Sequence, residues 1–174
     1  DDYALFHAVL DYFQGKDWRQ WPTDIRSREQ GALEKYRNQL SEEILFFKYL
    51  QWLYYLQRLE IRAYARQKKV FLLGDLPIYP AVNSADAWSN QDLFEFGRSN
   101  GAPPDQFNAD GQYWGSIPYA WEKNYDAVLE FWLRRIRHSA ELFDGMRIDH
   151  LLGFCGEWVI PWGEHPLKGR FEPA

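Results

Sequence analysis

Two aspartates stand where short apolar runs of the chain end. Asp75 comes just after Val70–Leu73, and Asp149 ends the run Gly145–Asp149. In parallel α/β folds, functional side chains gather at the carboxyl ends of strands. If the two runs are neighbouring strands, their ends lie about 5 Å apart, and two carboxylates there suit acid–base, metal or sugar chemistry. The alternative for each aspartate is that it caps the turn that follows.

Arg147 lies two residues before Asp149, so the two side chains point to the same face of a strand. A charge pair inside a buried strand is costly unless it has a function. We therefore expect Arg147 to keep a neighbouring carboxylate ionised. His150 follows Asp149 directly and is the histidine with the strongest functional claim. Cys155 has no basic partner nearby in the sequence, which argues against a catalytic thiol.

The pattern along the chain predicts an α/β protein. The expected helices are a short one over Tyr3–Phe13, a long one from an N-cap at Ser41 to near Lys68, and one over 125–143. The polar stretch over residues 27–39 is compatible with either a helix or an extended connection. The long helix is expected to have one apolar face that packs in the core. This face consists of Leu45, Tyr49, Trp52, Leu56, Leu59 and Ala63. Val70–Leu73 is expected to be a strand buried on both faces, and a further extended piece is expected over 157–161.

The segment Gly74–Lys123 is rich in Gly, Pro, Asn, Ser and Asp and is predicted to be one long loop. A connection of that length in a compact domain is usually functional. Its aromatic residues are Trp88, Phe94, Phe96, Phe107, Tyr113, Trp114, Tyr119 and Trp121. Aromatic faces among amide and carboxyl groups suit the C–H faces and hydroxyls of sugars. The alternative is that these rings form a small core of the loop itself.

Composition excludes several classes of partner. The 174 residues carry 20 basic and 25 acidic side chains, a net charge of −5, which argues against nucleic acid or anionic membranes as partners. We see no apolar run of about 20 residues and no secretory signal, so a cytoplasmic location is expected. The single cysteine excludes an internal disulfide and a cysteine zinc site. No metal or cofactor motif is apparent.

Several motifs together resemble those of the 4-α-glucanotransferases, the amylomaltases or disproportionating enzymes of glycoside hydrolase family 77. They are Gly74-Asp75-Leu76-Pro77-Ile78-Tyr79, Ser84-Ala85-Asp86-Ala87-Trp88, Gly101-Ala102-Pro103-Pro104-Asp105, Gly111-Gln112-Tyr113-Trp114-Gly115 and Arg147-Ile148-Asp149-His150. They occur in the family's order over nearly the whole chain. The resemblance implies a (β/α)₈ TIM barrel and a retaining double displacement that moves α-1,4-glucan segments to an acceptor sugar, with no cofactor.

By motif position, the resemblance implies that Asp149 is the nucleophile and that Arg147 holds it ionised and oriented. It implies that Asp75, His150, Tyr79, Ser84 and Gln112 bind substrate. It also implies that Trp114 and Phe107 line the path of the glucan, a maltooligosaccharide.

The resemblance also implies that the catalytic set is incomplete within these residues. The family's acid–base glutamate lies in a later strand motif that does not occur before Ala174. A whole barrel takes about 250 residues or more. We therefore expect residues 1–174 to be a fragment of the barrel, with 74–123 as its substrate loop, inactive without the remainder of the catalytic domain. Two alternatives stay open: an α-glucan hydrolase of the same clan, and a non-catalytic α-glucan-binding module.

Overall fold

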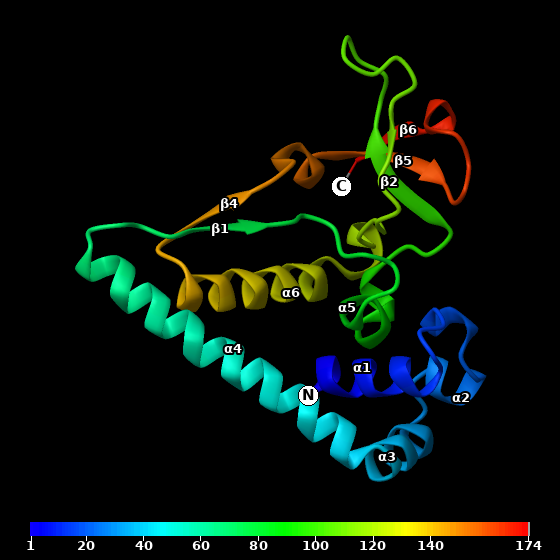
Figure 1. The fold of residues 1–174 in the computed structure, drawn as a ribbon. Coiled ribbons are helices and arrows are strands. Elements are labelled where there is room, and N and C mark those ends of the chain that lie inside the picture. Colours follow the sequence, from blue (N-terminus) through cyan, green and yellow to red (C-terminus); the bar gives the residue numbers. More distant parts are fainter. Residues whose placement is uncertain (174) are drawn as a thin grey trace. The chain divides into compact units, whose positions relative to one another are not determined.

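The computed structural model describes residues 1–173 and divides into two compact units (Figure 1). The first unit comprises Asp1–Lys68 with Asn83–Asn90, and the second comprises Lys69–Val82 with Gln91–Ala174. The motif residues are therefore distributed over both units. Ser84 belongs to the first unit, and the two strand-end aspartates belong to the second.

The first unit is helical. Its elements are α1 (Asp2–Tyr12), η1 (Trp18–Gln20), α2 (Thr23–Arg26), α3 (Gln30–Gln39), α4 (Ser41–Gln67) and α5 (Ala85–Ser89). The predicted first helix is confirmed as α1, and most of the stretch left open over 27–39 forms α3. Aromatic rings fill the core: Trp88 lies 5.6 Å from Trp21 and 5.9 Å from Phe6 between centroids. The buried indole Nε1 of Trp88 donates a hydrogen bond to the carbonyl of Ile25 at 3.1 Å.

Helix α4 has the predicted length, but two expectations about it are wrong. Leu40, not Ser41, is its N-cap, and no side chain caps it. The face expected to be core is largely exposed, with Leu45 66% exposed and Trp52 55% exposed. Only Ile44 and Ala65 of the helix are buried. Helical periodicity shows which residues share a face, but it does not show which neighbouring element covers that face.

The second unit combines a parallel strand pair with an antiparallel sheet. Strands β1 (Leu73–Leu76) and β4 (Gly145–Ile148) pair in parallel, and helix α6 (Trp121–Leu142) packs against both. The four-stranded sheet has the order β3-β2-β5-β6. Its strands are β2 (Arg98–Ala102), β3 (Gln112–Tyr113), β5 (Gly156–Pro161) and β6 (Arg170–Pro173). Short turns η2 (Gln91–Leu93), η3 (Leu151–Phe154) and η4 (Pro166–Lys168) complete the unit.

Strand β1 begins three residues later than predicted and is not buried on both faces. Val70, Phe71 and Leu73 are exposed, whereas Gly74 and Leu76 are buried. Side chains alternate across a strand, so α6 covers one face of β1 while Leu73 and Asp75 lie on the other. Asp75 therefore lies within the strand, not beyond it. A continuous apolar run cannot by itself distinguish a doubly covered strand from the last residues before a half-covered one.

The segment predicted as one long loop is largely folded. Residues 74–123 contain most of β1, then α5, η2, β2 and β3, and the start of α6. Helix α6 begins at Trp121, four residues before the predicted start, and is kinked at Asn124, whose side chain donates to the carbonyl of Asp92 at 2.6 Å. The predicted strand over 145–149 and the extended piece over 157–161 are confirmed as β4 and β5.

Strand β5 buries an acidic side chain, Glu157, which is only 3% exposed. Its Oε2 accepts a hydrogen bond from Asn100 Nδ2 at 2.7 Å, and the Trp121 side chain also acts to lower its pKa. Burial raises the pKa of Glu157 to about 7, and the hydrogen bond from Asn100 opposes that rise. The nearby carboxylates Glu95 and Glu172 add to the rise in pKa.

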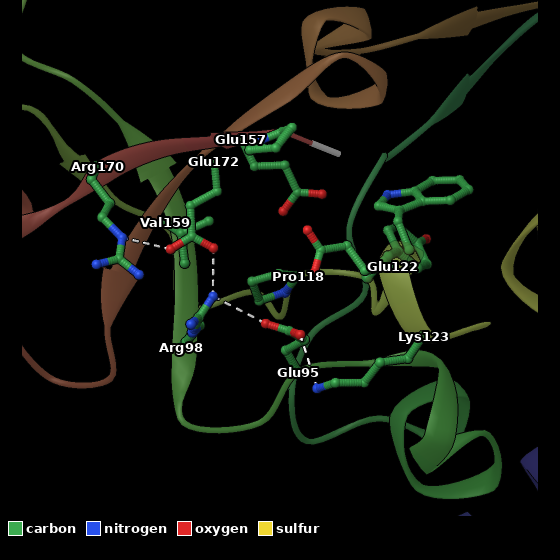
Figure 2. A pocket seen from close by; sticks show the side chains of 12 residues that line it. Glu95, Arg98, Pro118, Glu122, Lys123, Glu157, Val159, Arg170 and Glu172 are labelled. Carbon is green, nitrogen blue, oxygen red and sulfur yellow. Dashed lines mark hydrogen bonds and ion pairs between the residues drawn. The ribbon is translucent and has the colours of Figure 1, made fainter. Parts of the chain in front are cut away.

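Glu157 lies at the edge of a cavity of about 430 Å³ whose walls are charged (Figure 2). Arg98 bridges two of the carboxylates, with contacts of 3.1 Å to Glu95 and 2.5 Å to Glu172. Lys123 pairs with Glu95 at 3.2 Å, and Arg170 pairs with Glu172 at 2.7 Å. The neighbouring cations are thus engaged by other carboxylates and leave Glu157 without an ion pair among the residues described.

We predict that Glu157→Gln stabilises the protein selectively at neutral and alkaline pH. The folded pKa of Glu157 lies above its unfolded value of 4.5, so stability is lost as pH rises from about 4.5 to about 7. Glutamine carries no charge, so at this position the free energy of unfolding does not fall over the same pH range. The expected gain is about 3 kcal/mol above pH 7 and close to zero near pH 4. Urea unfolding at both pH values measures it, and equal effects at the two pH values would contradict the assignment.

We predict that Gly74→Ala destabilises the second unit by about 1–3 kcal/mol. A Cβ on Gly74 would lie 2.6 Å from the ring of Phe143, which follows the C-terminal end of α6, so the helix must shift away from β1. The matched control is Gly156→Ala, whose added Cβ comes no closer than 3.4 Å to any neighbour. Thermal unfolding should show a lower midpoint for Gly74→Ala alone, and equal midpoints for the two variants would refute this account.

Candidate active site

One arginine joins the two predicted aspartates. Arg147 Nη1 lies 2.7 Å from Asp75 Oδ2, and Arg147 Nη2 lies 2.5 Å from Asp149 Oδ1. The pairing of the strands explains this geometry, because Asp75 on β1 is in register with Arg147 on β4. Asp149 follows two residues later and points to the same face. The two strands are therefore neighbours, which is the condition under which the sequence placed the two carboxylates close together.

The charged group is open to solvent, contrary to the expectation of a charge pair inside a buried strand. The side chains of Asp75, Arg147 and Asp149 are 59%, 60% and 60% exposed. They occupy the face of the β1–β4 pair opposite α6, and no described element covers that face over them. Arg147 engages only one oxygen of Asp149, and Oδ2 has no hydrogen-bond partner within the described part of the chain.

Three aromatic side chains gather beside the charged group. The Trp114 and His150 rings meet edge to face, with 4.8 Å between centroids. Tyr79 lies 6.2 Å from each of them. His150 directly follows Asp149, and Tyr79 lies four residues after Asp75. The structure thus brings together six of the residues singled out from the sequence: Asp75, Tyr79, Trp114, Arg147, Asp149 and His150.

Tyr79 is the buried member of this aromatic cluster. Burial raises the pKa of its phenol above the ordinary value, and the nearby Glu157 and Tyr119 contribute. A Cβ on Gly153 would overlap the Tyr79 hydroxyl and crowd the Ile78 side chain, so a larger residue there would displace Tyr79. Helix α6 anchors the backbone next to Tyr79, because Arg135 donates to the carbonyls of Pro77 and Ile78 at 2.5 and 3.1 Å.

His150 has an unusual backbone conformation. Its φ of 52° and ψ of 47° lie in the left-handed region, which is uncommon for residues other than glycine. Such strain costs about 1–3 kcal/mol and is concentrated at functional sites. The turn aims the chain sharply away from β4 immediately after Asp149 and sets the imidazole against Trp114.

The remaining predicted residues have different surroundings. Gln112 Oε1 accepts a hydrogen bond from Trp114 Nε1 at 2.9 Å, so Gln112 is an immediate neighbour of the aromatic cluster. Phe107 is 88% exposed in the connection between β2 and β3, which extends away from the four-stranded sheet (Figure 1). Ser84 caps α5 in the first unit, and its Oγ accepts from the amide of Ala87 at 3.2 Å.

Sequence reasoning missed a buried polar group behind the cluster. Ser99, Asn100 and Glu157 are at most 3% exposed and are linked by hydrogen bonds to each other or to the turn that carries Trp114. The available signal was the alternation in β5, where Glu157 shares its face with Val159. That signal is weak, because the other face of β5 carries Trp158 and Ile160 and is also apolar.

Over residues 1–173, no three or more His, Cys, Asp or Glu side chains are grouped so that they could hold a metal ion. None of the helices described is both long enough and apolar enough to cross a membrane.

The arrangement has the features of a nucleophilic site for a sugar. An oriented carboxylate with one unengaged oxygen can attack an electrophilic carbon. Adjacent aromatic faces with an amide and an imidazole beside them suit a ligand that has both C–H faces and hydroxyls.

Comparison with known proteins identifies the family of the chain. The family model described as 4-alpha-glucanotransferase matches residues 1–174. The 4-alpha-glucanotransferases of Aquifex aeolicus and Synechocystis are 37% and 39% identical to the chain over 99% of its length. The chain spans about a third of those relatives, 37% and 36% of their lengths.

A solved structure supports the same relationship. The amylomaltase from Streptococcus agalactiae in complex with acarbose superposes with a TM-score of 0.94 at 33% identity. That match covers 99% of this chain and 37% of the amylomaltase. The family model, the sequence relatives and the solved structure all agree. The chain therefore belongs to the 4-alpha-glucanotransferase family, glycoside hydrolase family 77.

Proposed function

We propose that these residues form the nucleophile-bearing part of a 4-α-glucanotransferase, which moves α-1,4-glucan segments to an acceptor sugar with retention of configuration. The observation that carries the proposal is the bridge from Arg147 to Asp75 and Asp149 at the end of a parallel strand pair. The family match, and the acarbose complex of the Streptococcus agalactiae amylomaltase, support a glucan as the substrate.

In the first step, Asp149 Oδ2 attacks the anomeric carbon of a glucose unit. The bond from that carbon to the glycosidic oxygen breaks, and a carboxylic acid protonates the departing oxygen. In the second step, a hydroxyl of the acceptor sugar attacks the same carbon. Its proton passes to the conjugate carboxylate and Asp149 is released. Two inversions give net retention. We place the acid–base carboxyl group outside residues 1–174.

Arg147 has two roles in this proposal. Its fork-shaped guanidinium holds Oδ1 of Asp149 and leaves Oδ2 free to react. It also joins Asp149 to Asp75, which we assign to the floor of the sugar site. Tyr79, Trp114, His150 and Gln112 form the adjacent wall. We also assign Phe107 and Ser84 to contacts with the glucan.

We further propose that the complete catalytic domain is a closed (β/α)₈ barrel in the cytoplasm. The parallel pair β1–β4 with its connecting helix α6 is one βαβ unit, and the exposed apolar face of α4 suits further packing. Residues 1–174 alone are expected to be inactive. The unpaired Cys155 suits a reducing compartment.

The experiment that tests this proposal is product analysis with maltotriose. A transferase converts maltotriose to glucose and longer maltooligosaccharides, whereas a hydrolase gives only glucose and maltose. A binding module leaves maltotriose unchanged. Longer products from the full-length protein support the proposal, and either of the other outcomes overturns it.

We predict that Asp149→Asn in the full-length protein lowers kcat on the order of 10⁴-fold, because an amide cannot form the glycosyl ester. The control is Asp126→Asn, a change at an exposed position of α6 that should stay within about twofold of wild type. Initial rates of glucose release from maltotriose measure both variants. Full turnover by the Asp149→Asn protein would exclude Asp149 as the nucleophile.

We predict that Arg147→Lys lowers kcat by about 10- to 100-fold with an unchanged thermal midpoint. A lysine ammonium is a point charge and cannot hold two carboxylates in one plane as the guanidinium does. Arg137→Lys is the matched control, since Arg137 also pairs with a carboxylate, Glu130 at 3.3 Å, but on the surface of α6. Equal kinetics for the two variants would show that the bridge is dispensable.

A further inference from the structure

We propose that Glu157 is a positioning residue for the glucan site: its carboxyl group holds Asn100, and Asn100 holds the turn that presents Trp114 beside Asp149. This inference rests on the proposed function, because it assigns to a buried carboxyl the task of setting the sugar-binding wall. Among the described residues no hydrogen bond or ion pair joins Glu157 to Asp149, so it acts through other residues.

The first link is the side chain of Asn100. Both Asn100 and Glu157 are almost fully buried, at 1% and 3% exposed. The 2.7 Å hydrogen bond from Asn100 Nδ2 to Glu157 Oε2 joins β2 to β5 across the middle of the four-stranded sheet. Loss of the acceptor would leave a buried amide without a hydrogen bond, so the position of Asn100 depends on Glu157.

The second link runs from Asn100 to the Trp114–Ser116 turn. The backbone N–H of Asn100 donates to the backbone carbonyl of Ser116 at 3.0 Å. The backbone carbonyl of Asn100 accepts from the backbone N–H of Trp114 at 3.0 Å. Ser99 adds a third attachment, since its Oγ accepts from the amide of Gly115 at 3.0 Å. The same Oγ donates to the carbonyl of Asn100 at 2.9 Å. The turn is thus fixed by its backbone at three successive residues.

The third link is the contact of Trp114 with the active site. Its ring meets His150 edge to face at 4.8 Å, and His150 is the residue next to Asp149. The Trp114 ring is itself 37% exposed, so a sugar can reach it. The turn beneath the ring sets the position of its backbone, while the hydrogen bond from Nε1 to Gln112 helps to orient the indole, so a shift of the turn moves the wall relative to the nucleophile.

The surroundings of Glu157 favour an uncharged carboxyl in this role. Arg98, Lys123 and Arg170 are engaged with Glu95 or Glu172, and these two carboxylates face the same cavity as Glu157 (Figure 2). A neutral carboxyl accepts from Asn100 through its carbonyl oxygen, as a glutamine does. Glutamine is therefore the conservative replacement, and leucine removes the acceptor while keeping a similar volume.

The test compares Glu157→Leu, Glu157→Gln and Ile160→Val in the full-length protein. We expect Glu157→Leu to raise the KM for maltotriose about tenfold while kcat changes less than threefold. Glu157→Gln is expected to restore KM to within twofold of wild type. Ile160→Val trims a fully buried side chain of the same strand that takes no part in these hydrogen bonds, and should leave KM within twofold.

A second variant approaches the same link from the other side. Asn100→Ala removes the side-chain hydrogen bond and keeps the backbone bonds to Trp114 and Ser116, so it should reproduce the rise in KM. The double variant with Glu157→Leu should show no larger rise than either single change, because both break one link. A wild-type KM for either single variant, or additive effects in the double variant, overturns the proposal.

A readout independent of activity separates this inference from the proposed function. In protein labelled with 5-fluorotryptophan, the ¹⁹F resonance of Trp114, assigned with Trp114→Phe, should shift in Glu157→Leu and Asn100→Ala only. It should stay at its wild-type position in Glu157→Gln and Ile160→Val. An unmoved resonance in Glu157→Leu refutes the positioning role even where glucan transfer occurs. Absence of transfer by wild type refutes only the proposed function.

Discussion

The bridge that Arg147 makes between Asp75 and Asp149 is the interaction on which the candidate site depends. It requires that β1 and β4 be parallel neighbours, that Asp75 and Arg147 be in register, and that Asp149 lie two residues further along. A shift of one residue in the register would turn Asp75 toward α6 and leave the guanidinium with one carboxylate. The packing of α6 on the strand pair, including the close approach of Phe143 to Gly74, therefore serves the chemistry indirectly.

The second unit supports the site in two ways. The strand pair supplies the charged group together with Tyr79 and His150, and the four-stranded sheet supplies Trp114 through the turn that carries it. The two parts meet at His150, which is covalently next to Asp149 and in ring contact with Trp114. His150 has a left-handed backbone conformation at this junction. In the proposed function the placement of Asp149 and of Trp114 matters, because errors of about 1 Å in a bound geometry cost large factors in rate.

Much of the charged group could be predicted from sequence. The short runs before Asp75 and Asp149 predicted two strands, though not that the strands are neighbours, and the spacing of Arg147 and Asp149 predicted a shared face. Helix α4, helix α6 and strands β4 and β5 were also predicted close to their observed bounds. The sequence did not predict three features: the start of β1, the secondary structure within 74–123, and the exposure of the apolar face of α4. Each of these depends on which distant segment covers an apolar residue, and local periodicity contains no such information.

Sequence by itself determined the kinds of residue available and their local order: a carboxylate after Arg147, a second carboxylate in an earlier strand, and an aromatic-rich stretch between them. Only the tertiary structure decided that Arg147 reaches both carboxylates, that Trp114 returns to His150 from 36 residues away, and that Glu157 is buried against Asn100. The physical reason is that these contacts join residues on different strands. Their formation depends on register and on the burial of polar groups across the sheet, which are properties of the packed chain and not of any one segment.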